Sequence, residues 1–208
     1  MRRQDSLRYS PFASDLRNPW ISRELREWLQ VLSWKNPADD HWCLKCPGHS
    51  WFFDAILDTF PDANIVWTHR NISNVVASLS SLMHAFSFLY RDRFDPVAFR
   101  NNLVDLVDIG VRRLMNCRDA LPANEQQRVY DVHFKNLMED PIPVVKDIYR
   151  AFGYDYTEEF EANMRRWLKE NPQGKHGSHN YSLDAYGIDR KELEQRFEEY
   201  VKRFSLSV

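Results

Sequence analysis

An apolar run that ends in two basic side chains constrains this chain more than any other feature. The segment ANIVWTH (residues 63–69) is almost continuously apolar, as expected of a strand buried on both faces of a parallel sheet. Arg70 follows it directly. An apolar pattern with helical spacing then begins, with Ser73 as the expected N-cap and Ser78 inside the helix. This order predicts a strand–helix unit with a guanidinium at the carboxyl end of the strand.

Two more segments are predicted to be strands, and the rest of the chain is predicted to be mainly helical. The strands are HWCLKCP (41–47) and RVYDVHF (128–134). Alternating strands and helices predict an α/β fold, with a mostly parallel sheet flanked by helices. Helical spacing, a proline start signal and a glycine stop signal predict helices over residues 22–34, 50–60, 73–86, 96–121, 140–152, 157–170 and 189–204.

Composition limits the class of protein. The 208 residues are 43% hydrophobic, which is enough for the core of one domain over residues 1–208, with residues 1–19 expected to be loosely ordered. A net charge of −2 gives no reason to expect nucleic acid or an anionic membrane as a partner. No window approaches the ~18 apolar residues of a membrane span. Three cysteines and the lack of a signal peptide indicate a reducing compartment, so we expect a cytoplasmic protein.

Arg70 and Ser78 together form a candidate anion site. In an open parallel sheet, ligands bind beyond the carboxyl ends of the strands. Helical side chains lean towards the helix N-terminus, so Ser78 can approach Arg70 where free N–H groups already favour an anion. A guanidinium, a hydroxyl and free amides suit a phosphate. The alternative is that Arg70 pairs with a surface carboxylate and that Ser78 is a small packing residue.

Lys45 and His49 flank the carboxyl end of the HWCLKCP segment in the same way. A lysine supplies a point charge for a developing anion, and a histidine is the natural base near pH 7. The alternative is a surface lysine and a histidine that caps a helix. Cys43 and Cys46 would point to opposite faces of a strand and have no two further zinc ligands nearby. We therefore expect both thiols in the core and expect no metal site.

The loop GKHGSH (residues 174–179) is the last candidate. It carries Lys175 and His176 but has no Walker pattern, because no Gly-Lys-Ser/Thr precedes a helix. It is either a solvated loop or a lid that closes basic groups over a ligand phosphate.

Together these segments resemble the sulfotransferase superfamily. The likeness is to its bacterial-type branch in particular, which is related to the tyrosylprotein and cytosolic sulfotransferases. The segments LKCPGHS and FPDANIVWTHRN, with a serine eight residues after Arg70, match the family pattern LKxPxH, FPDAxxVxxHR and serine. The later segments VYDVHFKNLMEDP and KHGSHNYSLDAYGID resemble the family blocks hYedLvxDP and RHxYsledFGld. The resemblance runs from about Trp42 to Phe204.

The resemblance implies a P-loop-NTPase-like sulfotransferase fold and a reaction. The reaction is transfer of a sulfuryl group from PAPS (3′-phosphoadenosine 5′-phosphosulfate) to a hydroxyl or amine of a small-molecule, peptide or carbohydrate acceptor. By this likeness, Arg70 and Ser78 bind the 3′-phosphate and Lys45 stabilises the transferring group. His49 is the candidate base. Two other classes stay open, namely a non-catalytic nucleotide-binding remnant and a P-loop kinase relative with a Walker sequence upstream and a magnesium requirement.

The remaining parts of the family pattern are matched less completely. Phe134 stands where the family has a tyrosine against the cofactor, so stacking is retained and a hydroxyl contact is not. Lys175 and His176 are the counterparts of the segment that closes over the nucleotide. Sulfotransferases begin with a strand and a Gly-rich loop that cradles the 5′-phosphosulfate, but none of the six glycines precedes LKCPGHS. We therefore expect the C-terminal portion of a longer enzyme that lacks this strand and loop, with self-association through exposed sheet edges.

Overall fold

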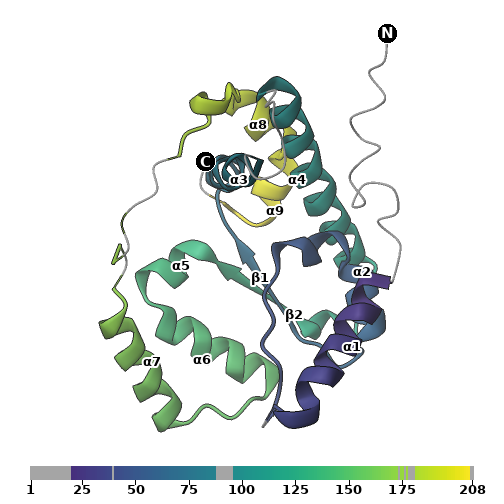
Figure 1. Cartoon of the computed structure of the whole chain (residues 1–208), viewed down its shortest axis with the longest axis vertical. Helices are drawn as coiled ribbons and strands as arrows, with labels where there is room; N and C mark the ends of the chain where they lie inside the picture. The colour runs from purple at the N-terminus through teal and green to yellow at the C-terminus, as the bar shows by residue number, and fades with distance from the viewer. Residues whose placement is uncertain are drawn as a thin grey trace. The chain divides into compact units, whose positions relative to one another are not determined.

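The computed structural model describes residues 20–38, 40–87, 96–172, 174, 175, 177 and 181–206 (Figure 1). The chain forms two compact units, and the single domain stays a prediction. One unit comprises Met1–Ala63 and Ile109–Leu121, and the other comprises Asn64–Asp108 and Pro122–Val208. None of the helices in the described ranges combines the length and the apolar character that crossing a membrane requires.

The larger unit is built on two parallel strands, β1 (Ile65–His69) and β2 (Val129–His133). Their register pairs Ile65 with Val129 at one end and His69 with His133 at the other. Both strands and their parallel direction were predicted from the sequence, and the structure confirms them. The helices of this unit are α3 (Ile72–Ser87), the first part of α4 (Pro96–Asp119), α5 (Phe134–Glu139), α6 (Pro141–Phe152), α7 (Glu158–Glu170), α8 (Arg190–Arg196) and α9 (Glu198–Arg203), with 3₁₀ turns at Gln126–Arg128 and Asp184–Tyr186.

Aromatic side chains hold helices on both faces of this small sheet. On one face, the rings of Trp67 and His69 lie 4.9 and 3.8 Å from the ring of Phe204, just after α9. Tyr130 has the opposite parity in the register, and its ring lies 6.1 Å from that of Phe152 at the end of α6. Because alternate residues of a strand point to opposite faces, the C-terminal segment covers one face and α6 covers the other.

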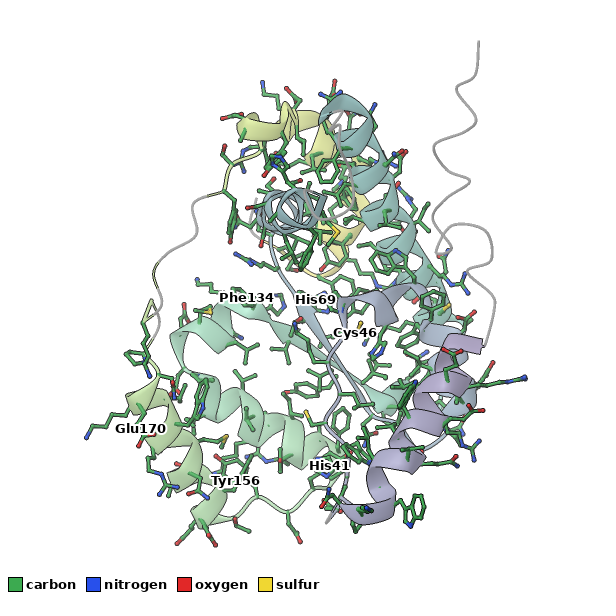
Figure 2. The ribbon with its side chains drawn as sticks, in the orientation of Figure 1. His41, Cys46, His69, Phe134, Tyr156 and Glu170 are labelled. Atoms are coloured by element: carbon green, nitrogen blue, oxygen red, sulfur yellow. The ribbon has the colours of Figure 1, made fainter. Side chains whose placement is uncertain are left out.

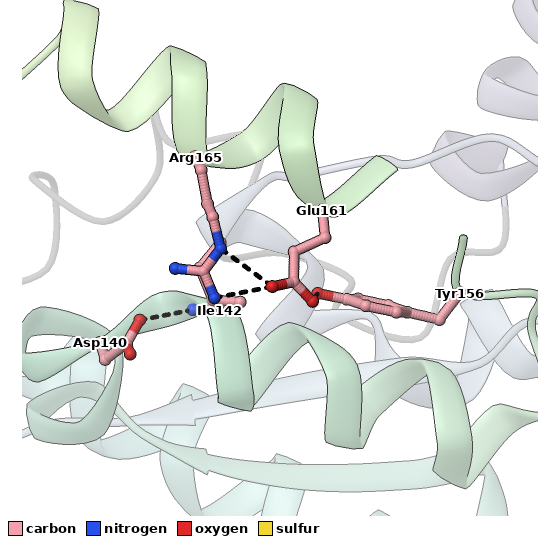
Figure 3. A network of polar contacts seen from close by, with 5 residues as sticks. All are labelled: Asp140, Ile142, Tyr156, Glu161 and Arg165. Atoms are coloured by element: carbon pink, nitrogen blue, oxygen red, sulfur yellow. Dashed lines mark hydrogen bonds and ion pairs between the residues drawn. The ribbon is translucent and has the colours of Figure 1, made fainter. Parts of the chain in front are cut away.

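Asp140 and Gly153 set the ends of α6, and Thr157 caps α7 by accepting from the Phe160 amide at 3.1 Å. Asp140 caps α6 by accepting from the Ile142 amide at 3.0 Å (Figure 3). Gly153 ends this helix with a left-handed φ of +72°. At the start of α7, the Glu161 carboxylate accepts from Arg165 at 2.7 Å and from the Tyr156 hydroxyl at 3.0 Å (Figure 3). These two hydrogen bonds hold the pKa of Glu161 below its usual value, and the one from Arg165 has the larger effect.

The C-terminal helix predicted over residues 189–204 is divided into α8 and α9. Asp189 caps α8 by accepting from the Glu192 amide at 2.9 Å, which is the predicted start. The helix stops at Phe197, which is 2% exposed and whose φ of −104° and ψ of 16° are not helical. The bend lets α9 turn its own aromatic residues towards the sheet.

The smaller unit is helical in its described part. It contains α1 (Trp20–Lys35), a 3₁₀ turn at Pro47–Trp51, α2 (Phe53–Thr59) and the second part of α4. The predicted helix over residues 22–34 is confirmed as α1. Its apolar face includes exposed residues at helical spacing, namely Trp28, Val31, Leu32 and Trp34.

The prediction of a strand at HWCLKCP was wrong. Residues 41–46 have no regular structure, and the 3₁₀ turn follows at once. A strand exists only when a neighbour accepts its hydrogen bonds, and among the described residues β1 and β2 pair only with each other. Cys43 and Cys46 are consequently exposed, so their expected place in the core was also wrong.

Gly110 in α4 provides a test of packing in the smaller unit. A Cβ at this position would lie 2.7 Å from Nε1 of Trp51. Replacing a helical glycine by alanine ordinarily stabilises a protein, but here we expect Gly110→Ala to lower the free energy of unfolding by about 1–3 kcal/mol because the indole must move. Urea unfolding followed by circular dichroism measures this, and a gain in stability would show that the indole does not lie against Gly110.

Candidate functional site

The carboxyl ends of β1 and β2 bring Arg70 and Phe134 together. Because His69 and His133 are the last paired residues, the residues that follow them are neighbours. Figure 2 labels His69 at the end of β1 and Phe134 at the start of α5. The guanidinium carbon of Arg70 lies 4.6 Å from the centre of the Phe134 ring, which is the geometry of a cation–π contact. Phe134 is the first residue of α5 rather than the last residue of a strand. The predicted strand-end position of Arg70 is therefore observed, and an aromatic ring supports it.

A second side chain, Tyr181, holds the same guanidinium. Nη2 of Arg70 donates to the Tyr181 hydroxyl at 2.7 Å, although the two residues are 111 positions apart. Within the described ranges no carboxylate forms an ion pair with Arg70. The alternative interpretation, in which Arg70 pairs with a surface carboxylate, is therefore not what these residues show.

The start of α3 lies directly after Arg70. The side chain of Asn71 caps the helix by accepting from the Asn74 amide at 3.2 Å. The prediction that Ser73 is the N-cap was wrong, because the helix begins at Ile72. Ser73 is instead 1% exposed, and its hydroxyl has no hydrogen-bond partner among the described residues. Ser78 is half-buried in the second turn of the same helix.

A buried polar chain fixes the end of β1. His69 is 1% exposed, its Nε2 lies 2.9 Å from Oδ1 of Asp131, and its Nδ1 lies 3.2 Å from the hydroxyl of Tyr200. An ionised carboxylate only accepts, which assigns the imidazole proton to Nε2 and leaves Nδ1 to accept from Tyr200. The imidazole ring of His69 thus links β1 to β2 and α9.

Tyr200 extends this chain to the backbone of Arg70. Burial raises the pKa of the Tyr200 phenol strongly, the hydrogen bond from the Arg70 amide opposes this rise, and the charge of Asp131 adds to it. The hydroxyl therefore stays protonated and accepts from Arg70 while it donates to His69. Both the backbone and the side chain of Arg70 are thus held by residues that follow Phe134 in the sequence.

Lys45 and His49 belong to the smaller unit. Lys45 is exposed in the irregular segment before Pro47. His49 is half-buried in the 3₁₀ turn, and burial lowers its pKa, so the imidazole is neutral near pH 7. A neutral imidazole can accept a proton, and the role of His49 as the base stays a prediction.

The basic loop is described only in part. Lys175 donates to the backbone oxygen of Glu170 at 2.9 Å and to Oδ1 of Asn171 at 3.1 Å, so its ammonium lies at the C-terminus of α7. His176 lies outside the described residues. Among the residues that are described, no group of three or more histidine, cysteine, aspartate or glutamate side chains could hold a metal ion.

Several residues around Arg70 were missed by the sequence analysis. His69 and Asp131 were visible as polar interruptions of apolar strands, and that signal could have marked them as partners. Tyr181 and Tyr200 carried no local signal, because their contacts cross more than 100 positions of the chain.

Comparison with known proteins decides the family. A profile described as the Sulfotransferase family matches residues 13–158. The chain belongs to this family. It is similar to the crystal structure of sulfotransferase STF9 from Mycobacterium avium, with a TM-score of 0.85 and 28% identity over 97% of this chain and 51% of that one. The corresponding values for sulfotransferase STF1 from Mycobacterium tuberculosis H37Rv are 0.72 and 29%, over 88% of this chain and 47% of that one.

These matches also define the fold. The chain has the α/β sulfotransferase fold, with a small parallel sheet between helices. It spans about half the length of both solved sulfotransferases. No curated protein sequence matches the chain.

The buried chain at the end of β1 leads to a stability prediction. Asp131→Ala leaves the buried Nε2–H of His69 without this acceptor, so we expect the free energy of unfolding to fall by about 1–3 kcal/mol. Asp131→Asn retains an acceptor oxygen and should lose less. Asp147→Ala, which removes an exposed carboxylate paired with Arg150, is the control and should change little. Equal losses for the alanine variants of Asp131 and Asp147 in urea titrations would contradict the assignment.

Proposed function

We propose that this chain carries the 3′-phosphate side of a PAPS-dependent sulfotransferase site. The proposal extends to sulfuryl transfer to a hydroxyl or amine of a small molecule, peptide or carbohydrate. The observation that carries it is the environment of Arg70, a guanidinium at the carboxyl end of a parallel strand, next to the start of α3. Its described neighbours are an aromatic ring and a phenol rather than a carboxylate. A guanidinium without a fixed counter-charge favours a bound anion.

The residues can be given roles within this proposal. When bound, PAPS supplies an activated sulfuryl group on a nucleotide leaving group. Arg70 and Ser78 hold the 3′-phosphate, and Phe134 supports the guanidinium and lies against the cofactor. Lys45 supplies a positive charge where negative charge develops on the leaving group. His49, neutral because burial lowers its pKa, accepts the proton of the acceptor hydroxyl.

The basic loop has a secondary role in the proposal. Lys175 and His176 would close over the nucleotide. For Lys175 this requires the ammonium to leave its two contacts at the end of α7. Such exchange is inexpensive, because both contacts lie at the surface.

A non-catalytic nucleotide-binding protein is the second candidate function. The observation in its favour is that Lys45 is exposed on irregular backbone rather than fixed at the end of a strand. Incubation with ³⁵S-labelled PAPS and mixed phenolic, sugar and peptide acceptors separates the two functions. Labelled product supports transfer, whereas nucleotide binding without product supports the second candidate. Membership of the Sulfotransferase family favours either over a P-loop kinase relative.

We also propose a cytoplasmic location and self-association for the isolated chain. All three cysteines are free thiols, which suits a reducing compartment. Self-association would use the edges of the sheet, which has two strands among the described residues. Val66 on β1 is 42% exposed.

Arg70 gives the most direct test of the nucleotide site. Arg70→Ala removes a charge-assisted fork, so we expect affinity for adenosine 3′,5′-bisphosphate to fall roughly tenfold to over a hundredfold. Ser78→Ala removes one hydroxyl and should cost less. Arg166→Ala removes an exposed arginine of α7 and is the charge-matched control. Calorimetry that gives the same affinity for Arg70→Ala and the parent would exclude Arg70 from the site.

Lys45 is expected to act in the transition state. Lys45→Met should lower kcat far more than it weakens binding of the desulfated nucleotide, since only interactions that strengthen in the transition state raise the rate. Lys169→Met, at an exposed position of α7, is the control. Equal losses of turnover and of nucleotide affinity would identify Lys45 as a ground-state phosphate ligand instead.

The lowered pKa of His49 predicts a pH profile. The imidazole is active when it is neutral, so activity should fall as the pH drops through a pKa below the ordinary value of about 6.5. In His49→Ala this acidic limb should disappear and the rate should fall. An unchanged limb in the variant would assign the base to another residue.

A further inference from the structure

We propose that Tyr181 is a direct ligand of the phosphate that Arg70 binds, donating its phenolic hydrogen to the anion. This inference rests on the proposed function of Arg70 and adds a site residue from the C-terminal segment. Its starting point is the 2.7 Å contact between Nη2 of Arg70 and the Tyr181 oxygen. That distance is at the short end for an N–H···O hydrogen bond.

The phenolic O–H of Tyr181 is a donor that this hydrogen bond does not use. A guanidinium only donates, so the Tyr181 oxygen accepts from Arg70 and keeps its own hydrogen. No other hydrogen bond of Tyr181 occurs among the described residues. The free phenolic hydrogen therefore lies beside a positive charge, which makes the phenol a stronger donor.

The surroundings of the pair favour an anion as the missing acceptor. The Phe134 ring supports the guanidinium at 4.6 Å, which leaves the edge of the guanidinium for hydrogen bonds. An anion that accepts from a second N–H of Arg70 would lie next to the Tyr181 oxygen. It could then also accept the phenolic hydrogen of Tyr181. Arg70 and Tyr181 then bind the anion as one pair of donors, as a guanidinium and a hydroxyl commonly do with phosphate.

The buried hydrogen bonds of Asp131, His69 and Tyr200 fix the position of Arg70 in this pair. Tyr200 accepts from the Arg70 amide, and its donation to His69 ties it to the sheet. Tyr181 and Tyr200 therefore contact the same residue from two places in the C-terminal segment. Truncation or misfolding of this segment would remove a ligand and a backbone support together, so the segment is a functional part of the site.

The test compares two ligands that differ only in the position of the phosphate. Adenosine 3′-monophosphate and adenosine 5′-monophosphate have the same charge, so their affinity ratio isolates recognition of the 3′-phosphate. We expect the parent chain of 208 residues to prefer the 3′-isomer in calorimetry. Tyr181→Phe should reduce that preference roughly tenfold or more, the range for one hydrogen bond to a charged acceptor.

A matched variant controls for the loss of a phenol. The Tyr154 hydroxyl accepts from Asn64 at 2.9 Å, next to the opposite end of β1. Tyr154→Phe therefore makes the same chemical change in the same unit, away from Arg70, and should leave the preference unchanged. Melting curves of both variants show whether the fold is retained.

Each outcome decides between the assignments. If the parent prefers the 3′-isomer and Tyr181→Phe keeps that preference, Tyr181 is not a ligand while the role of Arg70 stands. A stronger preference in Tyr181→Phe would mean that the phenol occupies the phosphate position, which also overturns the proposal. If the parent does not distinguish the two nucleotides, the proposed function of Arg70 fails, and the role of Tyr181 fails with it.

Discussion

The parallel register of β1 and β2 is the constraint on which the rest of the larger unit depends. It ends both strands at the same level, with His69 opposite His133. The residues that follow the strands, Arg70 and Phe134, are therefore neighbours, and the guanidinium of Arg70 packs on the Phe134 ring. A shift of one residue would reverse the direction of every side chain on the strand and would break this contact.

A buried polar ring at the end of a strand has a cost that the fold offsets by complete hydrogen bonding. His69 is nearly inaccessible, yet Asp131 and Tyr200 satisfy both of its nitrogen atoms. An apolar residue would fill the same space without this requirement. His69 also fixes Tyr200, whose hydroxyl accepts from the Arg70 amide. These hydrogen bonds connect the sheet to the candidate anion site.

The failed strand prediction shows what local pattern leaves out. HWCLKCP has the composition of a short buried strand, as the β1 segment does, but only β1 has a strand beside it among the described residues. Backbone hydrogen bonds of a strand are made with another segment, so composition alone cannot supply them. Lys45 is therefore exposed on irregular backbone rather than at the end of a strand.

The sequence by itself determined the strand–helix unit, the parallel α/β class, the position of Arg70 and Ser78 and the family resemblance. These depend on local hydrophobic periodicity and on motif spacing, which are written in the order of the residues. The tertiary structure alone decided that Phe134 supports Arg70, that Asp131 and Tyr200 satisfy His69, and that Tyr181 contacts the guanidinium. These pairs join segments more than 60 positions apart, and only the register of the strands and the packing of the C-terminal segment bring them within hydrogen-bonding distance.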